Sequence, residues 1–372
     1  MAHQKHAKLI RPNGGQWGRN EVAIMGAPCG EIKKLVAELT KSLADDLQIA
    51  YVDAEHNAPE RNEWSALSYG ANAQLTDKIS HYSVEYANGK PNYFNDADLV
   101  IVNGNHFKAE KQIAWIHPKK SLEKKLEKLT NVSLIILEDD DTVIPDYLAD
   151  HLSGKEYKVL KRLEISAIQD FFQSQVNENK AQLNGLVLIG GKSTRMQKDK
   201  SRLVYNNNLP QHEYLTSLLG GFCEEVFVSV RDDSQAEEYD NATITDKFIG
   251  LGPYGGILSA FQYNPNSAWL VVAVDLPYLN EAAVSNLVTN RNTSKAATCF
   301  IDPQNEFPEP LITIWEPRAY PILLEFLSKG YSCPRKALIN SDVEVIIDRD
   351  VKALTNINTP EELAEALENS HE

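Results

Sequence analysis

The fold is decided by residues 186–200, which read LVLIGGKSTRMQKDK. Four apolar residues are followed at once by Gly190 and Gly191, and then by small, polar and basic residues. Because glycine has no Cβ, a Gly-Gly pair lets the backbone turn sharply and bring its N–H groups close to a ligand. Arg195, Lys198 and Lys200 add positive charge directly after that turn, which suits a polyphosphate. The stretch therefore predicts a buried strand that ends at a phosphate-binding loop.

The rest of the chain is acidic, and this contrast favours a local phosphate site. The 372 residues contain 52 Asp and Glu against 37 Lys and Arg, a formal net charge of −15. A Gly-Gly pair alone predicts no more than an ordinary turn, but three cations within the six residues 195–200 stand out against this background. The same acidic balance argues against a general nucleic-acid-binding surface.

Cysteine usage and hydropathy predict a cytoplasmic protein with no membrane partner. The four cysteines lie far apart in the sequence and form no Cys-x-x-Cys pair, which argues against a structural zinc site or a disulfide framework. No apolar run reaches the length of a membrane span. The basic start of the chain lacks the apolar segment of a signal peptide.

In the first half, apolar strand-like segments alternate with helical patterns, which predicts a parallel α/β sheet. Residues 21–25 lead into a glycine-bearing loop and then a helical leucine repeat, the layout of a P-loop. A working P-loop continues Gly-Lys-Ser/Thr, whereas here Glu31 follows Gly30 and no hydroxyl residue follows Lys33 and Lys34. We predict a P-loop-like domain that has lost NTP hydrolysis, with a purely structural or docking role favoured.

The alternation restarts in the second half, so we expect two α/β domains, residues 1–178 and 184–372. Residues 173–183 are polar and predict the linker between them. Four glycines within residues 250–256 predict an irregular loop that opens a helix. Residues 269–274 form the most apolar strand of the chain, and Asp275 follows directly. Ligands of parallel sheets bind beyond the carboxyl ends of the strands, so Asp275 is placed to hold a divalent cation.

Together these motifs resemble those of the molybdenum cofactor guanylyltransferases, which belong to the nucleotidyltransferase superfamily. The resemblance covers residues 184–370 in four motifs that occur in the family's order. They are Gly-Gly-x-x-x-Arg-Met with Lys200, Asp246 followed by Gly-Pro-x-x-Gly, Val-Asp-Leu-Pro around Asp275, and Asn-x-Asn-Thr-Pro from Asn356. The first half is similar to the small GTP-binding adaptor protein of the same pathway, although Asn103 stands where that family has an acidic residue.

The resemblance implies a Rossmann-like nucleotidyltransferase domain that transfers GMP from GTP to molybdopterin and releases pyrophosphate. It implies that Lys200 and Arg195 hold the triphosphate and that Asp275, with Asn356, binds Mg²⁺; the catalytic residues would be Lys200, Arg195 and Asp275. The implied nucleotide-binding residues are Leu188, Ile189, Gly190, Gly191, Lys200, Asp246, Gly252, Pro253, Gly255 and Asp275. Apo-molybdoenzymes or other cofactor-synthesis proteins are the implied macromolecular partners.

Two departures from the family pattern leave alternatives open. Ile189 stands where the family commonly has alanine, and Gln197 where it has glycine. A bulkier Ile189 side chain changes how a base packs, so a cytidylyltransferase or another nucleotidyltransferase of this fold stays open. A non-catalytic carrier of the molybdenum cofactor is an alternative of a different class, and magnesium-dependent nucleotide turnover separates it from an enzyme.

Overall fold

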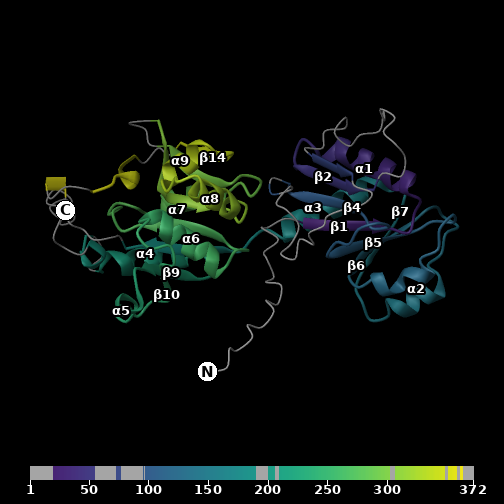
Figure 1. The fold of residues 1–372 in the computed structure, drawn as a ribbon, viewed down its shortest axis with the longest axis horizontal. Coiled ribbons are helices and arrows are strands. Elements are labelled where there is room, and N and C mark those ends of the chain that lie inside the picture. The colour runs from purple at the N-terminus through teal and green to yellow at the C-terminus, as the bar shows by residue number, and fades with distance from the viewer. Residues whose placement is uncertain are drawn as a thin grey trace, which may run out of the picture. The chain divides into compact units, whose positions relative to one another are not determined.

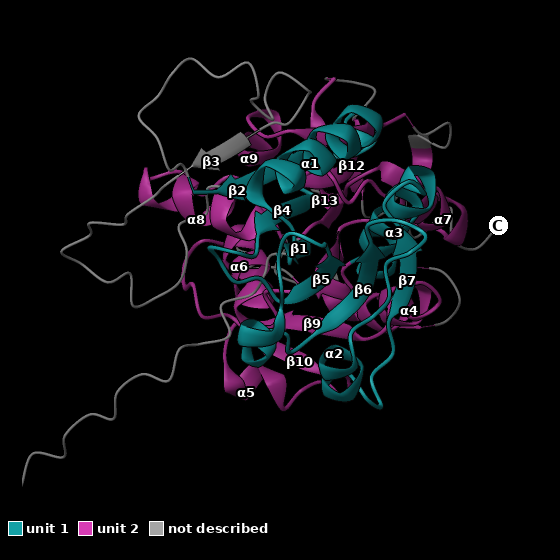
Figure 2. Cartoon of the chain, turned by 90° about the vertical axis from the view of Figure 1, so that its right-hand side faces the viewer, with its two compact units in different colours: residues 1–180 teal, residues 181–372 magenta. Residues whose placement is uncertain are grey.

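A computed structural model describes residues 20–54, 73–76, 95, 97–189, 200–205, 209–301, 306–347, 351–357 and 361–362. Contacts within the chain divide it into two units, Met1–Lys180 and Ala181–Glu372, which Figure 2 colours separately. All four cysteines are free thiols. In the described part of the chain, no helix is both long and apolar enough to cross a membrane.

Unit 1 is built on a seven-stranded parallel sheet with β1 at its centre (Figure 1). The strand order is β3-β2-β4-β1-β5-β6-β7. The strands are β1 Asn20–Met25, β2 Ile49–Asp53, β3 Ala73–Thr76, β4 Leu99–Asn103, β5 Lys111–Ile116, β6 Val132–Leu137 and β7 Lys158–Lys161. The helices are α1 Cys29–Leu43, α2 Asp146–His151 and α3 Ile165–Glu178, with a 3-10 helix η2 at Glu123–Lys128.

The polar segment expected as a linker is mostly helix. Helix α3 continues to Glu178 and β8 begins at Leu183, so only a short piece of residues 173–183 is a connection. The boundary between the two units, after Lys180, lies within this segment. Most of it is helical because the first eight residues of the helix anchor it on the core, with Ile168 and Phe172 fully buried. Its polar second half is the continuation of a helix already anchored on the core, with Val176 packed against the same cluster.

Unit 2 contains a mixed seven-stranded sheet in the order β10-β9-β8-β11-β13-β12-β14. Strand β13 is antiparallel to both β11 and β12, and the other pairs are parallel. The strands are β8 Leu183–Leu188, β9 Val226–Val230, β10 Thr243–Thr245, β11 Ala268–Ala273, β12 Ala297–Ile301, β13 Pro308–Trp315 and β14 Val343–Ile346. The α/β fold class predicted from the sequence is confirmed.

Helices cover both faces of this sheet, as the alternation of side chains along β8 and β11 requires. Val187 and Val272 pack in one apolar cluster with residues of α4 (Gln211–Gly220) and α7 (Glu281–Thr289). Leu188 and Val271 pack in a second cluster with residues of α6, α8 and α9. The remaining elements are α5 Asp233–Ala236, α6 Pro253–Tyr263, α8 Ala319–Ser328, α9 Pro334–Ile339, and the 3-10 helices η3 Lys200–Arg202 and η4 Val351–Leu354.

The glycine-rich segment was predicted to be irregular, but α6 begins at Pro253 and includes two of its glycines. A Cβ built on Gly255 would lie 2.4 Å from the Phe248 carbonyl oxygen, and one on Gly256 would lie 2.8 Å from Leu188 Cδ2. The glycines therefore serve close packing of a helix against the sheet and the preceding loop. The low helix propensity of glycine is overridden by this contact.

Candidate active site

The glycine motif after β8 and Asp275 after β11 start from neighbouring points of one sheet edge. Strands β8 and β11 are parallel neighbours, with Leu188 paired to Ala273. The Val274 N–H extends this pairing and donates to the Leu188 carbonyl at 3.1 Å. Ile189, at the start of the glycine motif, and Asp275 therefore leave the sheet side by side, at the edge where parallel sheets bind ligands.

A segment from near the end of the chain reaches the same point. The Ile357 N–H donates a hydrogen bond of 3.0 Å to the main-chain carbonyl of Asp275, which places Asn356 beside the predicted metal ligand. The Oδ1 atom of Asn356 is buried and has no hydrogen-bond partner in the structure. An unpaired buried acceptor costs about 1–3 kcal/mol, and a hard cation or a donor from a ligand would remove that cost.

A third group at this site, Tyr205, was missed by the sequence reasoning. It is only 4% exposed and packs with Ile357, Leu203 and Tyr278, and its hydroxyl is also buried with no partner in the structure. Burial, followed by the negative charge of Asp275, raises the pKa of Tyr205 to about 12. Tyr205 is therefore a protonated hydrogen-bond donor at neutral pH. Its segment carries no motif, so only the folded chain shows that it lies close to Asp275.

Asp246, predicted to bind nucleotide, holds the loop before α6 in place. Its Oδ1 atom accepts hydrogen bonds of 2.9 Å from both the Phe248 N–H and the Ser259 hydroxyl. Ser259 is buried on α6, and its Oγ accepts from the Lys247 N–H at 2.8 Å. These bonds fix the start of α6 against the preceding loop, and any direct contact of Asp246 with a nucleotide stays a prediction.

The start of α6 is open toward solvent at Gly252. Gly252 has φ 58° and ψ −137°, a backbone conformation that favours glycine, and no atom lies within 4 Å of a Cβ placed there. Pro253 takes the first helical position, and no side chain caps the helix. Pro253 has no N–H, and the Gly255 N–H donates to the Gly252 carbonyl at 2.9 Å. The Tyr254 N–H of this eleven-residue helix is therefore the group of the first turn that can face an anion.

The remaining predicted site residues are not placed by the structure. Gly190, Gly191 and Arg195 lie outside the described residues, as does the side chain of Lys200, whose backbone begins η3. The Asn-Thr-Pro part of the last motif also lies outside them. The roles of these residues stay predictions.

Comparison with known proteins finds similarity in the second unit. Residues 185–345 match the family model described as the MobA-like NTP transferase domain. A relative from Synechocystis sp., named molybdenum cofactor biosynthesis bifunctional protein, is 37% identical over 182 residues, which are 48% of this chain and 52% of the relative. The chain thus spans about half the length of that relative.

Two further comparisons extend over nearly the whole of the other protein. A probable molybdenum cofactor guanylyltransferase from Methanothermobacter thermautotrophicus is 28% identical over 193 residues, 48% of this chain and 95% of that protein. The solved structure of molybdopterin-guanine dinucleotide biosynthesis protein A from Archaeoglobus fulgidus shares 23% identity with a TM-score of 0.44, covering 50% of this chain and 98% of that one.

The donor set around Asp275 in unit 2 fits a magnesium ion. Among the described residues, no group of three or more His, Cys, Asp or Glu side chains is arranged to hold a metal. Mg²⁺ does not need such a cage, because it keeps several waters and binds through one or two carboxylates and the phosphates of the substrate. Asp275 offers a carboxylate, and the unpaired Oδ1 of Asn356 offers a neutral oxygen.

Proposed function

We propose that this protein transfers GMP from GTP to molybdopterin and releases pyrophosphate. The observation that carries the proposal is the convergence at one sheet edge of the end of β8, Asp275 after β11, and Asn356, joined through the Val274–Leu188 and Ile357–Asp275 main-chain bonds. The MobA-like domain match and the guanylyltransferase relative support it.

In this reaction the terminal phosphate oxygen of molybdopterin attacks the α-phosphorus of GTP, and the bond to the β-phosphate oxygen breaks. Two anions have to approach each other, so the protein has to neutralise charge and orient the groups, and it needs no covalent nucleophile. A magnesium ion, when bound, offsets charge on the α-phosphate and the leaving pyrophosphate. Asp275 and Asn356 would hold that ion, and Arg195 and Lys200 would bind the triphosphate.

The protein's own neutral donors would orient the nucleotide. The Tyr205 hydroxyl, buried without a partner, is available to donate to a phosphate oxygen or to a magnesium-bound water. The first turn of α6, opened by Gly252 and Pro253, would present the Tyr254 N–H to the nucleotide. Buried donors aimed at developing negative charge are the groups expected to favour such a transition state.

The test is pyrophosphate release by the full chain with molybdopterin and Mg²⁺, with GTP or CTP as the nucleotide. We expect turnover with GTP and formation of a guanine dinucleotide detectable by mass spectrometry. Turnover with CTP in place of GTP would show a cytidylyltransferase. Tight binding of molybdopterin without turnover of either nucleotide would show a carrier, and both results contradict the proposal.

A further inference from the structure

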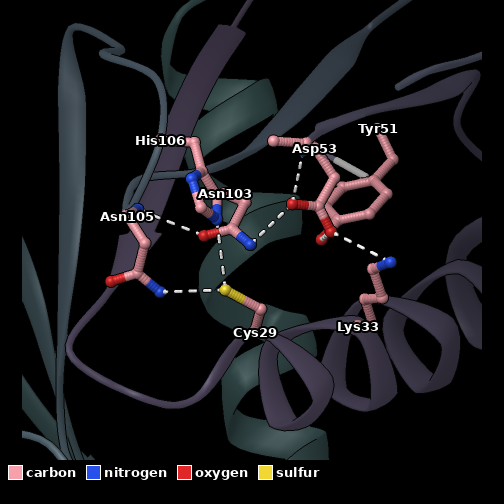
Figure 3. A network of polar contacts seen from close by, with 8 residues as sticks. Cys29, Lys33, Tyr51, Asp53, Asn103, Asn105 and His106 are labelled. Atoms are coloured by element: carbon pink, nitrogen blue, oxygen red, sulfur yellow. Dashed lines mark hydrogen bonds and ion pairs between the residues drawn. The ribbon is translucent and has the colours of Figure 1, made fainter. Parts of the chain in front are cut away.

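A second cluster of chemically active side chains lies in unit 1, at the carboxyl edge of its parallel sheet (Figure 3). The cluster is built on Asp53, which stands at the end of β2 and is fully buried. Asp53 accepts hydrogen bonds from the Tyr51 hydroxyl at 2.8 Å and from Asn103 Nδ2 at 2.7 Å. The Lys33 ammonium lies 3.6 Å from the same carboxylate, so the cation that follows the P-loop-like turn is already paired within the protein.

The network positions the loop after β4. Asn103 Oδ1 accepts from the Asn105 N–H at 3.1 Å, and Asn105 Nδ2 donates to the Ala27 carbonyl at 3.0 Å. The Gly104 N–H also donates to the Ile24 carbonyl at 2.8 Å. This loop is therefore fastened both to β1 and to the turn before α1, and it carries His106.

The loop after β4 places the imidazole of His106 beside the thiol of Cys29. Cys29 is the first residue of α1, and its Sγ lies 3.2 Å from His106 Nε2 (Figure 3). Asn105 Nδ2 lies 3.8 Å from the same sulfur. A thiol at a helix N-terminus with a histidine in contact is the environment in which cysteines act as nucleophiles. Cys29 is partly exposed and His106 is exposed, so a small molecule can reach them.

Lysine side chains lie close to both members of the pair. Lys125 Nζ donates to Asn105 Oδ1 at 3.3 Å, on the residue that also touches Cys29. A cavity of about 70 Å³ is lined by His106 together with Lys108 and Lys128. In a chain of net charge −15, Lys125 near the thiol and two lysines in the cavity beside His106 favour an anionic reactant.

The other cysteines provide internal comparisons. Burial raises the pKa of Cys223 and of Cys299 to about 12, so both stay protonated and unreactive at neutral pH. Cys333 is exposed at the start of α9. It is therefore the reference for a thiol that solvent reaches freely.

We propose that Cys29 and His106 form a nucleophilic pair that takes up anionic low-molecular-weight disulfides as a mixed disulfide. His106 Nε2 accepts the thiol proton in the tautomer that carries its hydrogen on Nδ1. The Cys29 sulfur attacks one sulfur of the disulfide, a new S–S bond forms and the old one breaks. The departing thiolate takes the proton back from His106. Cys29 is oxidised and the departing half of the reactant is reduced, so electrons balance.

The test uses the full chain with oxidised glutathione as the anionic probe and cystamine as a cationic one of the same chemistry. Peptide mass spectrometry follows the modification of each cysteine at neutral pH. We expect Cys29 to react with oxidised glutathione about tenfold faster than Cys333, and His106→Gln to remove that advantage. We expect Lys125→Gln to reduce the preference for glutathione over cystamine, by slowing the glutathione reaction and not the cystamine reaction.

Equal rates at Cys29 and Cys333, or a Cys29 rate that His106→Gln does not change, would overturn the proposal. Circular dichroism and thermal unfolding check that each variant is folded. If His106→Gln is not folded, the rate of alkylation of the unaltered chain by iodoacetamide is measured between about pH 5.5 and 8.5. An imidazole-assisted Cys29 shows a pH profile that differs from that of Cys333. Parallel profiles for the two cysteines would refute the pair.

Discussion

Asp275 links two parts of the proposed site through different atoms. Its main-chain carbonyl accepts the Ile357 N–H at 3.0 Å and thereby fixes the segment that carries Asn356. We expect its carboxylate to bind the proposed metal. Asp275→Asn keeps the shape of the side chain and leaves the main chain unchanged. It should therefore leave the fold intact and remove the negative charge that attracts Mg²⁺.

We expect Asp275→Asn to lower pyrophosphate release by about 10²-fold or more and to raise the Mg²⁺ concentration needed for half-maximal rate. Steady-state kinetics over a magnesium titration measures both quantities. Asp240→Asn, at an exposed position of the same unit, is the matched control and should behave as the unaltered protein. A full rate in Asp275→Asn would remove this residue from the reaction.

The Tyr205 hydroxyl should stay protonated over the pH range of an activity assay. An ordinary tyrosine has a pKa of about 10, whereas burial and the charge of Asp275 raise the pKa of Tyr205 to about 12. The phenol therefore keeps its proton throughout the range in which the protein is assayed. We expect Tyr205→Phe to lower kcat by about tenfold, by the same factor at every pH between about 7 and 10.

The measurement is the pH–rate profile of the variant and the unaltered protein, with Tyr263→Phe, at a 60% exposed position, as the control. A rate ratio that falls toward one as the pH approaches 10 would mean that Tyr205 ionises in this range. A ratio of one throughout would mean that its unpaired hydroxyl takes no part in the reaction.

At the scale of elements, α6 depends on having no side chain at Gly255. A Cβ there would lie 2.4 Å from the Phe248 carbonyl oxygen and 2.9 Å from Asp246 Oδ2. The nearest obstacle is main chain, which cannot swing aside as a flexible side chain does. We expect Gly255→Ala to lower the free energy of unfolding by about 1–3 kcal/mol, and to weaken nucleotide binding because the loop before α6 shifts.

Gly220→Ala on α4 is the matched control. No atom lies within 4 Å of a Cβ at that exposed helical position, so alanine should be neutral or stabilise the protein by up to about 1 kcal/mol. Urea denaturation of both variants measures the difference. If Gly255→Ala is as stable as Gly220→Ala, the close contact does not explain the glycine.

These elements also show what the sequence could and could not predict. Long apolar strands were predictable, because burial on both faces leaves a plain hydrophobic signal. Strand β11, Ala268–Ala273, lies within one residue of the predicted bounds 269–274. The helical conformation of Gly255 and Gly256 was not predictable, since close tertiary contacts select glycine there and local helix propensity does not report such contacts. The same holds at the site: Asp275 follows its strand directly in the sequence, whereas Tyr205 reaches the site through packing against Ile357.

At the scale of the whole molecule, each unit encloses apolar clusters of its own. The clusters around Leu35 and Leu148 draw only on residues of unit 1, and those around Val272 and Ile257 only on residues of unit 2. A unit with its own hydrophobic core is expected to fold by itself. The residues proposed for nucleotide transfer all belong to unit 2, and the Cys29–His106 pair belongs to unit 1.

We therefore expect residues 181–372, expressed alone, to fold cooperatively and to release pyrophosphate from GTP and molybdopterin at a rate within about threefold of the full chain. Each unit is long enough to bury a hydrophobic core that keeps it folded without the other unit. Thermal unfolding and the pyrophosphate assay, run on both halves and on the full chain, measure the two expectations. A folded but inactive unit 2 whose turnover returns when unit 1 is added would show that the first unit takes part in the reaction, for example by delivering molybdopterin.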